Sequence, residues 1–188
     1  YDALRAEAQG GGASGDFTQE LFGFGKRRNP NEYILPGIMG SKLSVQVDGK
    51  NDLVWLDPID LRRGGVKKLK FEDAPNPVVA TGTFWAAYGA LRLRLSSRGY
   101  KVQFLPFDWR QSIPDLGAAL LGQVAGNGAH GAALVAHSMG GLVARQMAAL
   151  DAGRVIKRVV TMGTPNYGSY SPVQVFRLAS EMLDKIGR

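Results

Sequence analysis

The chain has 188 residues, of which 45% are hydrophobic, and it carries a net charge of +7 and no cysteine. This length and composition predict one compact domain with a substantial core, and they exclude collagen-like, disordered and coiled-coil chains. The lack of cysteine excludes disulfides and cysteine-bound metals, and no apolar run approaches the ~20 residues of a membrane-spanning helix.

The beginning of the chain reads as a linker followed by a strand and a hairpin. Residues 1–30 are rich in glycine and polar residues and are predicted to form a lead-in or linker. The domain itself is predicted over 31–188, and its first apolar strand runs into a Pro-Gly pair. Alternating segments at 43–47 and 53–56, around the turn sequence DGKND, predict a β-hairpin. This hairpin belongs to a stretch, 41–80, that we interpret as an insertion.

An amphipathic helix is predicted after the hairpin, because four apolar residues share one face at helical spacing. These residues are Phe84, Tyr88, Leu91 and Leu95. Thr81 or Thr83 is the predicted N-cap of this helix, and Gly99 is its predicted end.

Strands and helices then alternate along the rest of the chain. The predicted strands span 100–107, 131–136 and 154–165, and the predicted helices begin at Pro114, follow Ser138 as far as about Gly153, and span 172–186. Such alternation predicts an α/β fold, a doubly wound and mostly parallel sheet with helices on both faces. In these sheets ligands bind beyond the carboxyl ends of the strands.

Ser138 follows one of these carboxyl ends, in the stretch LVAHSMGGLVAR. The order of an apolar strand, a serine and a helical segment is typical of the nucleophile elbow G-x-S-x-G, a sharp turn that exposes a catalytic serine. Small residues are needed two positions before and after the serine, and here they are Ala136 and Gly140. On this stretch alone, a buried serine in a glycine-rich turn is an equally good interpretation.

Four motifs, ILPGIMGSKL, FLPFDWRQS, LVAHSMGGLVAR and VVTMGTPNYGS, occur in this order over residues 33–172. They resemble the lecithin:cholesterol acyltransferase-like branch of the α/β-hydrolase superfamily of serine lipases and esterases. The resemblance implies the amino-terminal part of an α/β-hydrolase fold, truncated after the strand that follows the nucleophile helix, with residues 166–188 as the start of a cap. It also implies that the strands ending at Pro36 and Ala136 are neighbours, so that the loops after them share one pocket.

The same resemblance implies roles for particular residues. Ser138 would be the nucleophile that forms an acyl-enzyme, and the backbone N–H groups of Met139 and Ile38 would form the oxyanion hole. Gly37 would allow the two backbones to approach closely. The implied activity is that of a lipase, esterase or acyltransferase on carboxylic esters, with lipid-like substrates, no cofactor and no metal. The DWR sequence is predicted to pack and to pair charges only, and Trp55 either borders the site or packs on the surface.

A catalytic base and acid are harder to find. The chain has two histidines: the ring of His137 is directed away from the serine in an elbow, and His130 is a strand's length, ~20 Å, from Ser138. The acids that follow the serine lie at the far end of the next helix or in the predicted cap helix; they are Asp151, Glu181 and Asp184. The missing carboxyl-terminal part of the same fold is therefore the expected source of both groups.

Two interpretations of function remain open. The first is a serine hydrolase or acyltransferase, and the second is a catalytically silent α/β-hydrolase-like module that binds a partner within a larger protein. An exposed serine together with an oxyanion loop favours the enzyme, since a silent module needs neither.

Positive charge gathers at residues 25–28, 62–70 and 154–158. No nucleic-acid motif accompanies these clusters, so no nucleic-acid partner is expected. A solvated basic face is the simpler interpretation, with a weak contact to an anionic membrane surface as the alternative. The first residues, YDALRAEAQGG, do not form a secretory signal, which together with the absence of cysteine slightly favours the cytoplasm but leaves the compartment open.

Overall fold

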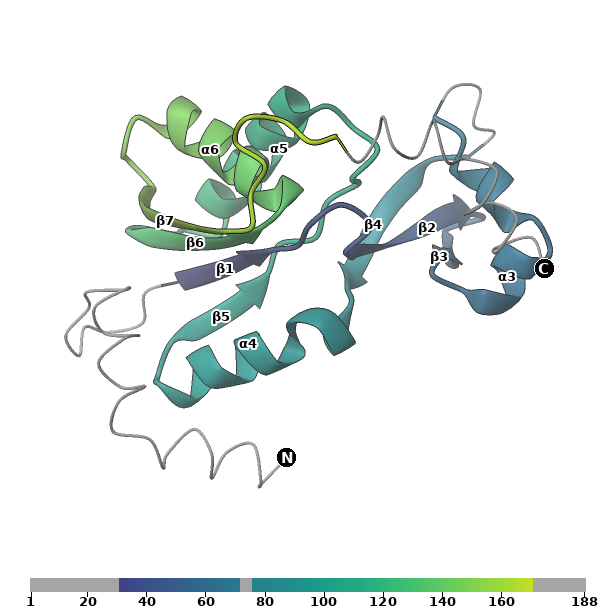
Figure 1. Cartoon of the computed structure of the whole chain (residues 1–188), viewed down its shortest axis with the longest axis horizontal. Helices are drawn as coiled ribbons and strands as arrows, with labels where there is room; N and C mark the ends of the chain where they lie inside the picture. Colours follow the sequence, from purple (N-terminus) through teal and green to yellow (C-terminus); the bar gives the residue numbers. More distant parts are fainter. Residues whose placement is uncertain (1–30, 72–75, 171–188) are drawn as a thin grey trace.

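The computed structural model describes residues 31–71 and 76–170. Its main sheet has four parallel strands in the order β5, β1, β6, β7 (Figure 1). Their bounds are Asn31–Leu35 (β1), Lys101–Phe104 (β5), Ala132–His137 (β6) and Ile156–Met162 (β7). Leu35 lies opposite Ala136, so β1 and β6 end side by side, as expected.

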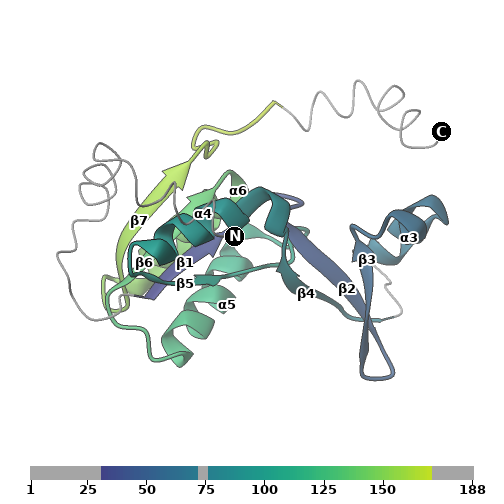
Figure 2. The same cartoon turned by 90° about the horizontal axis from the view of Figure 1, so that it is seen from below.

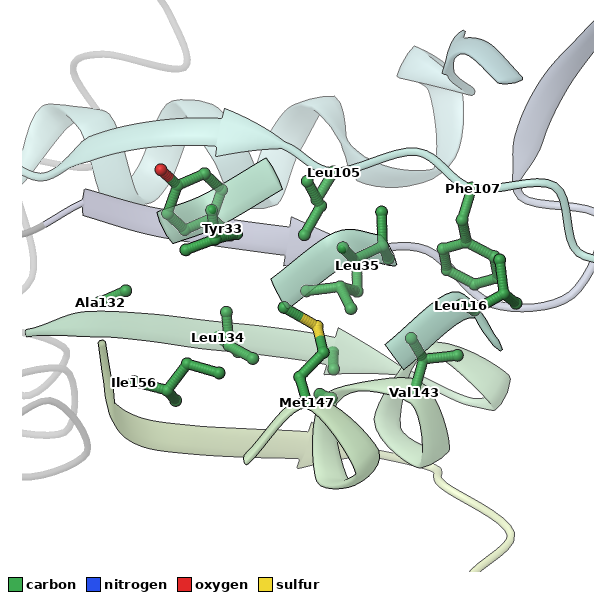
Figure 3. Close-up of a cluster of buried hydrophobic side chains, with 14 of the residues drawn as sticks. Tyr33, Leu35, Leu105, Phe107, Leu116, Ala132, Leu134, Val143, Met147 and Ile156 are labelled. Carbon is green, nitrogen blue, oxygen red and sulfur yellow. The ribbon is translucent and has the colours of Figure 1, made fainter. Parts of the chain in front are cut away.

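Helices cover both faces of this sheet (Figures 1 and 2). Along β1, Tyr33 and Leu35 pack toward α5 and α6, whereas Ile34 packs toward α4. The larger core, between the sheet and α5 and α6, includes the fully buried Leu134 and Met147 (Figure 3). This arrangement confirms the predicted doubly wound fold. The helix bounds are Trp85–Ser97 (α4), Ile113–Gly126 (α5) and Met139–Asp151 (α6).

A second, antiparallel sheet with the order β3, β2, β4 lies beyond the end of β1 (Figure 1). Its hairpin is the predicted one, and the turn residues Asp48 and Gly49 have φ angles of 49° and 72°, which suit the twist of a two-residue hairpin turn. The elements of this region are β2 (Ser41–Val47), β3 (Lys50–Trp55), α3 (Pro58–Arg62), the 3-10 helix η1 (Gly65–Leu69) and β4 (Val78–Thr83).

The start of α4 differs from the prediction. Thr81 and Thr83 do not cap the helix, because both lie in β4, whose last residue pairs with Ser41 of β2. Phe84 takes the N-cap position instead. Gly99 follows the end of the helix with a φ of 87°, as its predicted role as a helix stop requires.

The DWR sequence joins the two sheets. Asp108 and Arg110 form a two-pronged ion pair with N–O distances of 2.8 and 2.6 Å, which confirms the predicted charge pairing. Arg110 also donates to the carbonyl oxygen of Leu69 at 2.8 Å, and the indole of Trp109 donates to that of Ser41 at 3.3 Å. These contacts tie the end of β5 to the insertion.

Some predicted segments lie outside the described residues, namely the lead-in at 1–30 and the helix at 172–186 within the predicted cap. In the described part, no strand pairs with the outer edge of β7. No helix in that part has the length and apolar character needed to cross a bilayer.

Candidate active site

Ser138 forms a sharp turn between β6 and α6. Its backbone has φ 51° and ψ −123°, a sparsely populated conformation that costs a non-glycine residue about 1–3 kcal/mol. The turn is held by two hydrogen bonds, from the Ser138 N–H to the carbonyl oxygen of Met162 at 2.9 Å and from the Gly141 N–H to that of Ser138 at 3.0 Å. This is the strand, turn and helix that the sequence predicts around the serine.

The small residues near Ser138 make room for neighbouring backbone and side chains. A Cβ atom at Gly140 would lie 2.9 Å from the carbonyl oxygen of Leu35 and would also meet that of Pro36. A Cβ atom at Gly141 would meet the side chain of Thr164. Gly140 therefore lets α6 begin directly against the end of β1, and Gly141 leaves room for the segment after β7.

The loop after β1 folds into a tight turn beside the serine. The Gly40 N–H donates to the carbonyl oxygen of Gly37 at 3.0 Å, and Met39, within this turn, has a φ of 60°. A Cβ atom at Gly37 would lie 3.0 Å from both the Cβ of Ser138 and the Nδ1 of His137. The two loops are thus in contact, and a side chain at Gly37 would crowd Ser138 and His137 at the point of closest approach.

Some backbone N–H groups around this turn donate a hydrogen bond, and others have no acceptor among the described residues. The Gly37 N–H donates to the hydroxyl of Tyr88, and the Gly40 N–H closes the turn. No hydrogen bond of the described residues uses the Ile38 N–H. Met139 is the first residue of α6, where N–H groups have no partner within the helix. Neither the Ile38 N–H nor the Met139 N–H therefore has a hydrogen-bond partner among the described residues.

Trp55, the last residue of β3, contacts the same turn from the insertion. Its indole Nε1 donates to the carbonyl oxygen of Met39 at 2.9 Å. Its ring packs edge-on against Trp109, with 5.5 Å between the ring centroids. The ring packs on the fold, as one of the two alternatives predicts, and the indole N–H reaches the loop beside Ser138.

Tyr88 is a residue near the site that sequence reasoning missed. Its hydroxyl accepts the Gly37 N–H at 2.9 Å and lies 2.9 Å from Nδ1 of His137. The helical pattern places Tyr88 on the core face of α4, where it is 7% exposed. The sequence shows a phenol on an otherwise apolar helix face, which could have drawn attention to Tyr88. It does not show which loop the hydroxyl contacts.

Comparison with known proteins agrees with this geometry. A model of the alpha/beta hydrolase family matches residues 54–185. The chain belongs to the α/β-hydrolase family. In fold it is similar to the mature form of the Bacillus licheniformis lipase BlEst2, with a TM-score of 0.50 and 19% sequence identity. The similarity covers 88% of this chain and 53% of the lipase, so the chain spans about half the length of that protein. No curated protein sequence matches it.

Neither histidine of this α/β-hydrolase chain is presented to the serine. The Nδ1 of His137 is engaged by the hydroxyl of Tyr88, and the residue as a whole is exposed. His130 is exposed and precedes β6, whereas Ser138 follows it, so the length of the strand, ~20 Å, separates the two.

Asp151 has a structural role at the far end of α6. It is 2% exposed, and its carboxylate accepts the N–H groups of Val155 and Ile156 at 2.9–3.0 Å. Burial opposes its charge, but these N–H groups and Arg154 outweigh burial and lower the pKa of Asp151. Glu181 and Asp184 lie outside the described residues.

Glu32 is a buried carboxyl at the opposite end of β1 from the site. It is fully buried, both of its oxygens lack a hydrogen-bond partner, and burial raises its pKa to about 7. It therefore bears on stability rather than on the chemistry at Ser138. Within residues 31–71 and 76–170, no three metal-binding side chains come together.

Proposed function

We propose that the protein is a serine hydrolase that acts on carboxylic esters through an acyl-enzyme on Ser138. The observation that supports this most directly is the contact between the strained Ser138 turn and the Gly37–Gly40 turn. Attack of the serine oxygen on an ester carbonyl places negative charge on the carbonyl oxygen. The unused N–H groups of Ile38 and Met139, on either side of this contact, are the groups that would stabilise that charge.

The reaction also needs a base that takes the proton of Ser138 and an acid that orients the base. Since His137 is engaged by Tyr88 and His130 lies at the other end of β6, we propose that both groups come from polypeptide outside these 188 residues. The similarity to a lipase of which this chain spans about half is consistent with that proposal.

The proposed class of ester substrate rests on the four sequence motifs. They resemble the lecithin:cholesterol acyltransferase-like branch, and from this resemblance we propose a lipid-like ester as the substrate. Water as the acceptor of the acyl group gives hydrolysis, and an alcohol gives acyl transfer.

A weak contact with anionic membranes is the second part of the proposal, and it is located on α3, η1 and the residues after them. Ile59 and Phe71 are 62% and 65% exposed. Between these two apolar residues lie exposed basic side chains, namely Arg62, Arg63, Lys67, Lys68 and Lys70. Exposed apolar residues among basic ones favour the surface of an anionic bilayer.

Reaction of the full-length protein with a fluorophosphonate probe tests the proposed activity. We expect Ser138 to be labelled, and Ser138→Ala to abolish labelling and to lower kcat on p-nitrophenyl butyrate by about 10⁴–10⁶. Ser97→Ala, which changes an exposed serine of α4, is the control and should keep full activity. A wild-type protein that is inert to both probe and ester, with the elbow intact, would instead favour the silent binding module.

A further inference from the structure

Three segments of the chain meet at the phenol oxygen of Tyr88. This oxygen lies 2.9 Å from the backbone nitrogen of Gly37 and 2.9 Å from Nδ1 of His137. It would also lie 3.0 Å from a Cβ atom at Gly40, so the turn packs closely around it. Because α4 holds the nearly buried ring, the phenol is a fixed point between the loop after β1 and the turn after β6.

One assignment of the hydrogens at this meeting point uses both the donor and the acceptor capacity of the phenol. The phenol oxygen accepts the N–H of Gly37, so its own proton is available for Nδ1 of His137. We assign Nδ1 as the acceptor, and with this assignment the neutral imidazole carries its proton on Nε2. With this tautomer both hydrogen bonds of the phenol are satisfied.

The two anchored residues are close neighbours of the two free N–H groups. Gly37 immediately precedes Ile38, and His137 is separated from Met139 by Ser138 alone. The hydrogen bond at Gly37 fixes the Pro36–Gly37 peptide plane, which comes one residue before the plane that carries the Ile38 N–H, and the bond to His137 holds the end of β6 just before the nucleophile. One side chain therefore holds both arms of the proposed oxyanion hole.

We propose that Tyr88 is a positioning residue for acyl transfer, which sets the spacing between the Ile38 N–H and the Met139 N–H through its bonds to Gly37 and His137. This inference rests on the proposed function of Ser138. Oxyanion donors stabilise the transition state only when their positions are set in advance. Tyr88 acts through the backbone and need not touch the substrate.

Steady-state kinetics of Tyr88→Phe in the full-length protein test this role. Removal of a whole oxyanion donor costs about 10²–10³ in kcat, so displacement of both donors should lower kcat about 10- to 100-fold, with KM nearly unchanged. Tyr33→Phe is the matched control. Tyr33 is also a buried tyrosine, but its hydroxyl, unlike that of Tyr88, has no hydrogen-bond partner. Its kcat should stay within twofold of the wild type. A similar kcat for Tyr88→Phe would overturn the proposal.

A second variant separates positioning from a general loss of stability. His137→Ala removes the other end of the bridge from an exposed site, so folding is little affected, and it should also lower kcat. The double variant should lose no more than the more severe single variant, because the two side chains act through one bridge. Fully additive losses would contradict a shared role.

The ¹⁵N spectrum of His137 examines the bridge without any reference to activity. Nδ1 should be unprotonated and hydrogen-bonded in the wild type, and should lose that bond in Tyr88→Phe. A proton on Nδ1 of the neutral ring would overturn the bridge as described. If the wild type has this tautomer but Ser138 is inert to the probe, both the proposed function and the role of Tyr88 are rejected. If the wild type is active and Tyr88→Phe is equally active, only the role of Tyr88 is rejected.

Discussion

The indole Nε1 of Trp55 lies 2.9 Å from the carbonyl oxygen of Met39 and donates a hydrogen bond to it. Met39 has a φ of 60°, so it occupies a left-handed conformation that is unfavourable for a side chain of its size. The turn that contains it is therefore held from two sides, by Trp55 from the insertion and by Tyr88 from α4. The antiparallel sheet is in this way part of the structure around Ser138.

Trp55→Phe should slow catalysis and should destabilise the fold only slightly. Because the bond to Met39 is exposed, water can replace it, and we expect a loss of less than about 1.5 kcal/mol in the free energy of unfolding. The turn loses its outer anchor, however, and kcat should fall roughly fivefold, since small displacements of catalytic groups are costly. Thermal melts and ester hydrolysis measure the two effects. Trp85→Phe, which changes a half-exposed tryptophan on α4, is the control, and equal kcat values for both variants would contradict the role of Trp55.

Gly140→Ala should destabilise the protein by more than about 2 kcal/mol. The added Cβ would lie 2.9 Å from the carbonyl oxygen of Leu35 and would also meet that of Pro36, and neither backbone can move without disturbing β1. Gly122→Ala in α5 is the matched control: nothing lies within 4 Å of its added Cβ, so alanine should stabilise that helix by up to about 1 kcal/mol. Urea unfolding of both variants gives the comparison, and equal midpoints would show that α6 does not need the glycine.

The sequence predicts the elements that depend on contacts between residues close together in the chain, and it misses those that depend on distant residues. β6, the Ser138 turn and the hairpin turn at Asp48 depend on residues within a few positions of one another, and the local pattern predicts them. β4 is different, because its six residues, VVATGT, do not alternate clearly and it forms by pairing with β2. The start of α4 therefore differs from the prediction, since Thr81 and Thr83 belong to that strand.

The contacts around the site also join residues far apart in the sequence, which local patterns do not predict. Tyr88 reaches Gly37 across 51 residues of sequence and His137 across 49. The sequence pattern indicates that Tyr88 is buried, but the hydroxyl's partners depend on how α4 packs across β1 and β6. Such a partner can be found only once the strand order is known.

Charge reversal on the segment around η1 tests the proposed membrane contact. Lys67 and Lys70 are exposed, and each basic residue near an anionic surface contributes about 1 kcal/mol. Changing both to Glu should therefore reduce co-sedimentation with phosphatidylserine vesicles at least tenfold, and leave the weak association with phosphatidylcholine vesicles unchanged. Reversal of Lys50 and Lys101, exposed lysines elsewhere, keeps the net charge equal and serves as the control. Equal losses in the two double variants would indicate a dependence on net charge alone.

Glu32 gives a prediction about the pH dependence of stability. Burial raises the pKa of its carboxyl from 4.5 to about 7, so the folded protein holds a proton that the unfolded chain releases. Between these two values the native state binds more protons, and its stability therefore falls as pH rises. The loss begins near pH 4.5 and is complete once the pH passes about 7.

Replacement of Glu32 by Gln should remove this dependence. At pH 8 the variant should be more stable than the wild type by up to about 3 kcal/mol, and at pH 4 the two should differ little, because the wild-type carboxyl is then neutral. Glu32→Leu provides a second comparison, since it removes the carboxyl without burying an amide, and it should show the same trend with pH. Urea unfolding at pH 4, 5.5, 7 and 8 measures the differences. A gap between variant and wild type that stays constant over this range would mean that Glu32 has the same pKa in the folded and unfolded states, and that its buried oxygens are hydrated or paired in solution.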